Sequence, residues 1–393
     1  MKIYYKISDW LETNWVTPAY AGGLLGVLSI FFFGAATNTM AGWLYVISGM
    51  SFALLGMGAL LPGRSLRQIK VRRHPIQPIT VGDNLSIALT IENSINQPLA
   101  LLQLQDQIPF VLGKPVQQAI EVIPAKETYH WVYHLPTKKR GIYRWHDLQL
   151  RTAAPLGLFW CRRSRNAKAT AIVYPTVLPL SSCPIIDELG QENSRQLHEH
   201  SRYQMASEGL TRTLRPYRFG DPSRLIHWRS SARYGELRVR ELEVSRGGEE
   251  ILICLDSAAD WQPDRFEAAV TAAASLYFYA SRSLLNVQLW TAATGLVHGN
   301  VAVLQTLAGV KFGEEIVAGN RPERSLLWLT ENSVSLTALP AGSRWLLWLD
   351  ESVASAAEKP KVQHCSGLEI TSNQPLEFQL QSSAATRNSK FKI

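Results

Sequence analysis

Cysteine is scarce in this sequence of 393 residues, and the four cysteines lie far apart. They are Cys161, Cys183, Cys254 and Cys365. No two of them form a CxxC pair and none has a histidine at ligand spacing, so neither a zinc site nor a disulfide framework is predicted. We therefore expect the cysteines to be reduced thiols in a part of the protein that lies in the cytosol.

The sequence also lacks the short motifs that mark common enzyme classes. It contains no GxSxG nucleophile elbow, no Walker phosphate loop, no HExxH zinc motif and no glycine-rich dinucleotide motif. His198 and His200 lie in a polar stretch without a partner nucleophile. We therefore predict that the protein is not an enzyme.

Charged residues are missing from two long apolar runs near the N-terminus. The runs cover residues 18–37 and 40–61, and only Asn38 and Thr39 separate them. Each run has the roughly 20 residues that a helix needs to cross a bilayer core. A secretory signal would instead be one shorter run followed by a cleavage site. We predict a two-pass transmembrane hairpin over residues 1–63; the alternative is a hairpin buried in a water-soluble protein.

Basic residues flank the two apolar runs. Lys2 and Lys6 precede the first run, and the second is followed by Arg64, Arg67, Lys70, Arg72 and Arg73. Because basic flanks stay on the cytoplasmic side, we predict a plasma (inner) membrane protein with both termini and most of the chain in the cytoplasm. The net charge of +8 favours acidic lipid headgroups, nucleic acid or an acidic protein without choosing among them.

Short alternating segments follow the second apolar run. Examples begin at Asn84 (NLSIALTIEN), Tyr129 (YHWVYHL) and Tyr143 (YRWHDLQLR). Alternation with period two, interrupted by turn residues, is typical of an antiparallel sandwich. We predict an immunoglobulin-like β-sandwich over residues 64–178 that acts as a spacer or packing module, because its loops carry no cluster of acids, histidines or nucleophiles.

Arginine is concentrated in residues 209–248, after a predicted linker at 179–208. Eight arginines lie between Gly209 and Arg240, against two acids, Asp221 and Glu236. Guanidinium groups suit carboxylates and phosphates, so this segment could bind an anionic partner. Alternatively, the arginines pair with nearby acids and hold the segment onto the next domain, which we favour slightly. Nucleic-acid binding is not predicted, because no RNP or KH module is present.

A short helix is predicted within the arginine-rich segment. Asp221 is a suitable cap and Pro222 suits the first turn, whereas Gly235 is placed to end the helix. Leu225 and Trp228 would then lie on one helix face. We predict that Asp221, Arg224, Trp228 and Arg233 mainly serve structure, and that Trp228 is buried on this face.

The remaining chain alternates between apolar strands and a helix. EEILICLDS ends near Asp256, helical spacing follows over residues 264–283, and VQLWTA, SLLWLT and RWLLWLD are further apolar runs. This pattern predicts a Rossmann-like α/β domain at 249–380, with a mostly parallel sheet and helices on both faces. Ligands bind such sheets at the carboxyl ends of the strands, where Asp256 and Asp350 would lie. Residues 381–393 are predicted to be a basic flexible tail.

The stretch from Leu214 to Arg233 resembles the signature of the bacterial domain-of-unknown-function family 58. The family typically shows an arginine-aromatic run, Gly-Asp, an Arg, Ile-x-Trp and Ser/Ala-Ala-Arg. The signature residues in this sequence are Arg215, Gly220, Asp221, Arg224, Trp228 and Arg233, with Ile226 and Ala232. Two N-terminal membrane helices and a β-rich middle are in family order. Ala154 stands where the family usually has Asp.

The resemblance implies that the last domain is similar to von Willebrand factor A domains, which often hold a divalent cation with Asp-x-Ser-x-Ser. Here Ala258 and Asp260 replace the two serines after Asp256. A standard metal site is therefore not predicted and no cofactor is assigned. Asp256 and Asp260 are the candidate ligands for a cation such as Mg²⁺. Otherwise, Asp256 caps the following turn.

The resemblance also implies a protein partner, because family members often occur beside MoxR-type AAA+ ATPases. We predict a membrane-anchored, non-enzymatic adaptor or scaffold that recruits such an ATPase or another cytosolic protein. The expected contact is the carboxyl-end rim of the α/β domain around Asp256. The alternative is a metal-dependent hydrolase acting at the membrane surface.

Overall fold

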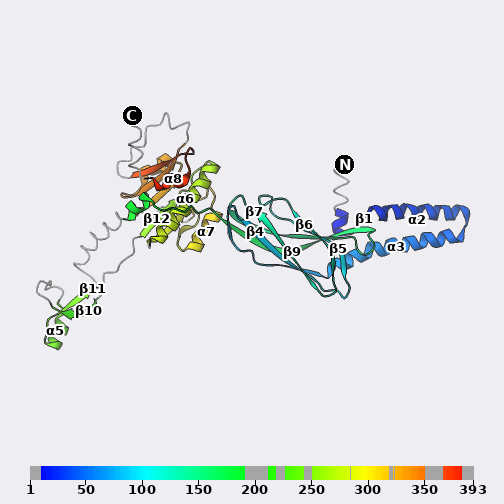
Figure 1. Cartoon of the computed structure of the whole chain (residues 1–393), viewed down its shortest axis with the longest axis horizontal. Coiled ribbons are helices and arrows are strands. Elements are labelled where there is room, and N and C mark those ends of the chain that lie inside the picture. The colour runs from blue at the N-terminus through cyan, green and yellow to red at the C-terminus, as the bar shows by residue number, and fades with distance from the viewer. Residues whose placement is uncertain are drawn as a thin grey trace. The chain divides into compact units, whose positions relative to one another are not determined.

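The computed structural model describes residues 10–190, 211–217, 226–242, 250–283, 285–317, 322, 324–349 and 366–382. The chain divides into two compact units, Met1–Tyr174 and Pro175–Ile393. The first unit holds a helical hairpin and β-sheets, and the second holds an α/β sheet (Figure 1). The chain is therefore multidomain, as its sequence predicts.

Two long apolar helices form the hairpin, α2 (Tyr20–Thr39) and α3 (Gly42–Arg67). Both are long and apolar enough to cross a membrane, so the two apolar runs are confirmed as helices. α3 continues past residue 63, where we expected the hairpin to end. The reason is that its last turn packs into the β-rich part: Leu66 is fully buried there, and the Arg165 guanidinium donates a hydrogen bond to the Leu66 carbonyl.

The described residues of the first unit form nine strands. They are β1 (Thr17–Pro18), β2 (Ile69–Arg73), β3 (Ile79–Thr80), β4 (Asn84–Asn93), β5 (Leu99–Asp106), β6 (Val116–Ile123), β7 (Thr128–Pro136), β8 (Gly141–Thr152) and β9 (Phe159–Tyr174). One sheet has the order β2-β4-β7 and the other β1-β9-β8-β5-β6, with β3 beside β9. The strands pair antiparallel except β3 with β9.

Alternating apolar side chains give these strands a buried face. In β4 the residues Leu85, Ile87, Leu89 and Ile91 are buried, and most residues between them are more exposed. This is the period of two that an extended strand imposes. Side chains of both sheets join one hydrophobic cluster, so the sheets pack face to face. The antiparallel sheets predicted for the middle of the chain are confirmed.

A buried polar cluster joins the two sheets across this core. Arg73 of β2 forms an ion pair with Asp106 of β5 at 2.9 Å, and their side chains are 1% and 0% exposed. Tyr133 of β7 donates to the same carboxylate at 2.6 Å, and Trp145 of β8 donates to it at 3.1 Å. The Arg73 guanidinium also lies 5.0 Å from the centroid of the Trp145 ring. Asp106 thus binds side chains from both sheets.

A mixed sheet forms the main part of the second unit. Its elements are β12 (Glu250–Leu255), α6 (Pro263–Arg282), β13 (Asn286–Thr291), β14 (Gly295–Val297), α7 (Asn300–Gly309), β15 (Leu327–Thr330), the 3-10 helix η2 (Ser333–Ala338), β16 (Arg344–Trp348), β17 (Ser366–Ile370) and α8 (Leu376–Gln381). The strand order is β14-β13-β12-β15-β16-β17, and only β14 is antiparallel to its neighbour. The α/β character predicted from the sequence is confirmed.

The two faces of this sheet are covered differently in the described part of the unit. Residues of α6, α7 and α8 all pack into one cluster on one face. The other face carries a row of large side chains that packs with η2, namely Cys254, Trp290, Trp328 and Trp345 with Leu336. We expected helices on both faces of the sheet, but in the described residues the α-helices cover one face only. Indole rings occupy this face instead, and the ring centroids of Trp290 and Trp328 are 5.9 Å apart.

Residues 175–190 pack onto α6, although we expected a linker from residue 179. Cys183, Ile186 and Leu189 are fully buried in the cluster that α6 also joins. The Tyr279 hydroxyl of α6 donates to the Asp187 carboxylate at 3.1 Å. These residues are apolar at the spacing of a helix face, which explains why they join the core of the second unit.

The cysteines Cys161, Cys183 and Cys254 are buried and free, whereas Cys365 lies outside the described residues. Burial raises the pKa of the Cys183 thiol to about 12. This thiol therefore stays protonated near neutral pH and is a poor nucleophile.

Candidate functional site

The described part of the signature lies in a small substructure of the second unit. The strands β10 (Thr211–Pro216) and β11 (Arg238–Leu242) pair antiparallel, and the helix α5 (Trp228–Tyr234) precedes β11. The predicted end of the helix is confirmed, because Gly235 follows α5 with a φ of 71° that favours glycine. Gly220, Asp221 and Arg224 lie outside the described residues, and so does the side chain of Arg215.

The predicted start of this helix is wrong. α5 begins at Trp228, and its cap is His227, whose Nδ1 accepts a hydrogen bond from the Ser230 amide at 3.2 Å. One residue earlier, Ile226 forms an antiparallel bridge with Val239. The backbone is therefore extended at Ile226, so a helix from Pro222 cannot run continuously into α5.

Trp228 is exposed, which corrects our prediction that it is buried. Its exposed fraction is 66%, and Arg233 and Tyr234 are exposed as well. The buried side of α5 is formed by Ser230 and Ser231, and the Ser231 hydroxyl accepts a hydrogen bond from the Arg238 amide at 2.9 Å. Small side chains thus bring α5 close to β11 and leave the indole outside.

The outer side of α5 combines aromatic and basic groups. We call Trp228, Arg229, Arg233 and Tyr234 the signature surface. The Arg238 guanidinium lies 4.1 Å from the centroid of the Tyr234 ring. Among the described residues, no salt bridge involves these arginines. Exposed tryptophan, tyrosine and arginine are the residue types enriched at protein interfaces.

We expect Trp228→Ala to leave this substructure folded. Exposed substitutions usually change the free energy of unfolding by less than about 0.5 kcal/mol. Val239→Ala is the matched control, because Val239 is 2% exposed and its truncation should destabilise β11. Amide hydrogen exchange over residues 226–242 measures both effects. Exchange accelerated as strongly by Trp228→Ala as by Val239→Ala would contradict the exposed position.

Asp256 lies at the carboxyl end of β12, where its carboxylate is tied to the neighbouring strand. The Thr330 hydroxyl donates to Asp256 Oδ2 at 2.7 Å, and the Asp256 amide donates to the Leu329 carbonyl at 3.0 Å. Asp256 is 8% exposed, whereas Asp260 is exposed. Within the described residues, no group of three or more histidines, cysteines or acids could hold a metal ion. Asp256 therefore lies between the ends of β12 and β15, with its carboxylate held by Thr330.

A polar pocket of about 490 Å³ lies along the same carboxyl edge, at the ends of β16 and β17. The first turn of α6 forms one wall, where Arg265 pairs with Glu331. The lining includes Gln262, Asp264, Arg265, Trp348, Thr371 and Gln379. The expected rim of the α/β domain is therefore hollowed and polar.

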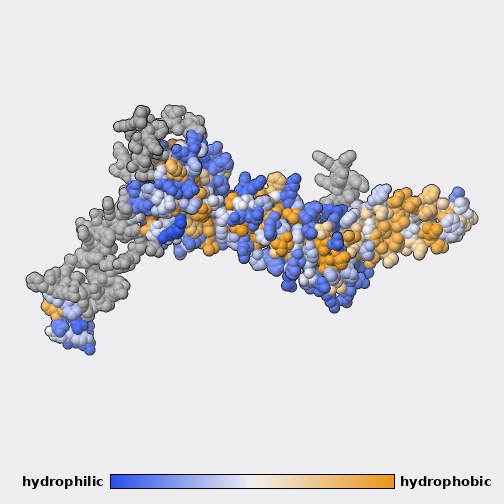
Figure 2. All heavy atoms as spheres, viewed as in Figure 1, coloured by the Kyte–Doolittle hydropathy of each residue, from blue (hydrophilic) through white to orange (hydrophobic). Residues whose placement is uncertain are grey.

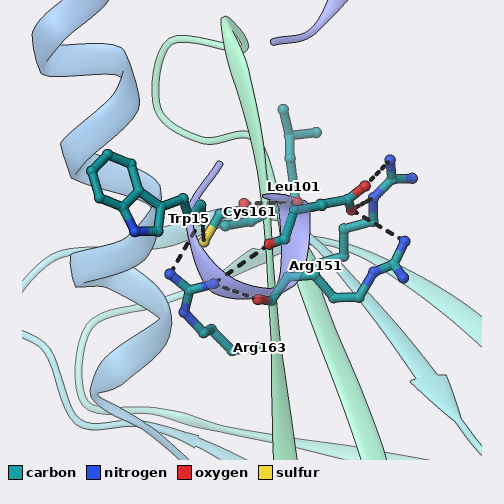
Figure 3. A network of polar contacts seen from close by, with 8 residues as sticks. Trp15, Leu101, Arg151, Cys161 and Arg163 are labelled. Atoms are coloured by element: carbon teal, nitrogen blue, oxygen red, sulfur yellow. Dashed lines mark hydrogen bonds and ion pairs between the residues drawn. The ribbon is translucent and has the colours of Figure 1, made fainter. Parts of the chain in front are cut away.

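The base of the hairpin holds a polar network that the sequence did not reveal. Glu12 pairs with Arg151 of β8 and Arg162 of β9, and its side chain is only 7% exposed. Arg163 donates hydrogen bonds to the carbonyls of Thr13 and Trp15 (Figure 3). Because β1 also pairs with the start of β9, the segment before α2 is fixed to the larger sheet. No local spacing could show these contacts, since the partners are about 140 to 150 residues apart.

These elements define a class of protein in which an N-terminal helical hairpin precedes antiparallel β-sheets and a mixed α/β sheet. Residues 213–297 match the family described as "Protein of unknown function DUF58". The match includes the signature surface, β12, α6 and β13. The resemblance to family 58 is thus confirmed over this range.

A curated relative is the uncharacterized protein YeaD of Bacillus subtilis (strain 168). It is 25% identical over 278 residues, which cover 68% of this chain and 66% of that protein. The matched part therefore spans just under two thirds of the relative's length. Because this relative is uncharacterized, it indicates no specific activity for this chain.

Solved structures show only remote similarity. The CARDB domain of PF1109 from Pyrococcus furiosus has 9% identity and a TM-score of 0.19, with 26% of this chain and 93% of that chain covered. A beta-glucosidase from Listeria innocua in complex with isofagomine has 12% identity and a TM-score of 0.18, with 28% and 16% covered. Both scores are below 0.5, so these similarities carry no argument.

Proposed function

We propose that the protein is a membrane-anchored, non-enzymatic adaptor. The observation that carries the anchor is the exposed apolar surface of α2 and α3. Only 17% of the most apolar window of each helix is buried, and side chains such as Phe31, Val46 and Leu60 are about two thirds exposed. Hydrophobic residues cover the visible face of the hairpin (Figure 2). A core helix of a soluble protein would be mostly buried, and water-soluble proteins rarely expose so large an apolar surface.

The basic flank supports a cytoplasmic position for both units. Arg64 and Arg67 are exposed in the last turn of α3, and Lys70 and Arg72 are exposed on β2. Such a concentration of basic side chains next to a membrane helix favours the cytoplasmic side. We therefore propose a two-pass inner-membrane protein with an immunoglobulin-like sandwich and a von Willebrand factor A-like domain in the cytoplasm.

The signature surface supports recruitment of an acidic protein. Trp228 and Tyr234 offer apolar area, while Arg229 and Arg233 offer charge that no acid of the described residues neutralises. Charge complementarity of this kind steers encounter and gives specificity. The resemblance to family 58 makes a MoxR-type AAA+ ATPase the first partner to test.

We expect the full chain in lipid nanodiscs to bind the cognate MoxR-type ATPase with an affinity that falls as salt rises. Salt screens exposed charges over about 10 Å at 0.1 M. Trp228→Ala should weaken binding at least about tenfold, because central aromatic residues dominate interface energies. An exposed tyrosine outside this surface, as in Tyr20→Ala, is the control and should leave the affinity unchanged.

The same binding measurement separates the two candidate functions. If the protein is an adaptor, neither EDTA nor added magnesium should change its affinity for the ATPase. Binding that EDTA abolishes would favour the metal-dependent alternative at Asp256 and Asp260. No binding at any salt concentration would remove the ATPase as the partner.

A further inference from the structure

Guanidinium groups gather at the base of the hairpin, where the end of α3 lies beside β9. Arg64 and Arg67 are exposed in the last turn of α3. Arg163 and Arg165 of β9 lie beside this turn: Arg163 Nη2 is 3.8 Å from the position that a Cβ on Gly63 would take, and Arg165 donates to the Leu66 carbonyl. Among the described residues, none of these four arginines forms a salt bridge. We call them the base cluster.

Backbone carbonyls hold two members of the base cluster without neutralising their charge. Arg163 donates to the carbonyls of Thr13, Trp15 and Arg162. Arg165 donates to those of Ile69 and Ser164 in addition to Leu66. Burial, followed by the neighbouring charge of Arg163, lowers the pKa of Arg165, as expected where like charges are crowded.

Among the described residues of this region, the carboxylate of Glu12 is already neutralised. Glu12 is buried between Arg151 and Arg162, so two guanidinium groups share one negative charge. The described residues of the hairpin base therefore carry an excess of positive charge. Carbonyl oxygens satisfy hydrogen bonds of Arg163 and Arg165, and a ligand with full negative charge would add the missing counter-ion.

The base cluster lies at the depth where an inserted hairpin would meet lipid phosphates. Leu60 is 70% exposed, and Arg64 follows it after four residues, or about 6 Å of helix. Trp15 is 74% exposed at the same base, and its carbonyl binds Arg163. Exposed indole rings typically settle at the level of the headgroups.

We propose that Arg64, Arg67, Arg163 and Arg165 form a binding site for the phosphate of anionic phospholipid headgroups. This inference rests on the proposed membrane insertion of α2 and α3. Guanidinium groups match phosphate with paired hydrogen bonds, and zwitterionic lipids lack the net charge that this site attracts. The site would fix the β-rich part at the surface of an anionic bilayer.

The test uses the purified full chain in mild detergent and the dissociation constants of three probes: short-chain phosphatidylglycerol, short-chain phosphatidylcholine and inorganic phosphate. Phosphatidylglycerol should bind most tightly. Arg64→Gln combined with Arg67→Gln should weaken its binding about 25-fold, since each basic side chain near a membrane surface contributes roughly fivefold. Both side chains are exposed, so the double variant should fold.

The matched control is Lys138→Gln combined with Lys139→Gln, which removes the same charge. Both lysines are exposed and precede β8, whose first residue pairs with Val173, eight residues along β9 from Arg165 of the base cluster. That distance is about 26 Å of strand, so the control should bind phosphatidylglycerol within twofold of wild type.

Three outcomes would overturn the site: equal binding of the two lipids, equal weakening by the control, or inorganic phosphate binding as tightly as phosphatidylglycerol. Extraction of membranes with alkaline carbonate tests insertion separately. If the protein stays in the membrane after extraction but binds both lipids equally, only the proposed lipid site is contradicted. A chain that carbonate extracts contradicts the anchor as well.

Discussion

Asp106→Ala should destabilise the first unit by about 3 to 5 kcal/mol, the largest effect that we expect from a single substitution. Removing this carboxylate leaves the Arg73 guanidinium buried and unpaired, with its side chain 1% exposed. The donors of Tyr133 and Trp145 lose their acceptor at the same time. Burial, reinforced by Asp106, raises the pKa of Tyr133, so its hydroxyl remains a donor over the accessible pH range.

Thermal or denaturant unfolding of the full chain in detergent, followed at the first unit by hydrogen exchange, measures this loss. Asp147→Ala is the control, because Asp147 of β8 is 53% exposed and pairs with the exposed His146. Its effect should stay below about 1 kcal/mol. If the two substitutions cost the same, the cluster of Arg73 and Asp106 does not hold the sheets together.

Local patterns predicted the elements whose neighbours are close in sequence. The two apolar runs became α2 and α3, and the alternation from Asn84 became β4. Gly235 ended α5 as expected, because a glycine with positive φ is a local requirement. In each case the period or the backbone angle alone decides the structure.

The long-range contacts could not be predicted from the sequence, because the spacing of residues along the chain does not show which distant residues meet. Arg73 was counted in the basic flank, yet it is buried against Asp106, which is 33 residues away. Glu12 meets Arg151 across 139 residues. Similarly, the exposure of Trp228 follows from the close approach of Ser231 to β11, which a helical period cannot show.

The candidate site was predicted in part. The signature was recognised from residue types, but the structure turns Trp228 outward and so changes its expected role from packing to contact. Asp256 lies at a strand end as expected, and its bond with Thr330 depends on the parallel pairing of β12 with β15. That pairing joins residues about 75 positions apart, which sequence periodicity does not determine.

The central claim, a membrane hairpin with the rest of the chain in the cytoplasm, is tested most directly by reporter topology. A reporter fused after Ile393 should be active only in its cytoplasmic form. The same reporter inserted between Met40 and Ala41, in the turn between α2 and α3, should be active only in its periplasmic form. The expectation is all or none, because a charged domain does not remain partway across a bilayer.

Opposite activities at these two positions are the result that the account predicts. Periplasmic activity after Ile393 would contradict the cytoplasmic position of both units. Cytoplasmic activity at both positions would contradict the anchor itself and would leave α2 and α3 as a hairpin covered by another protein.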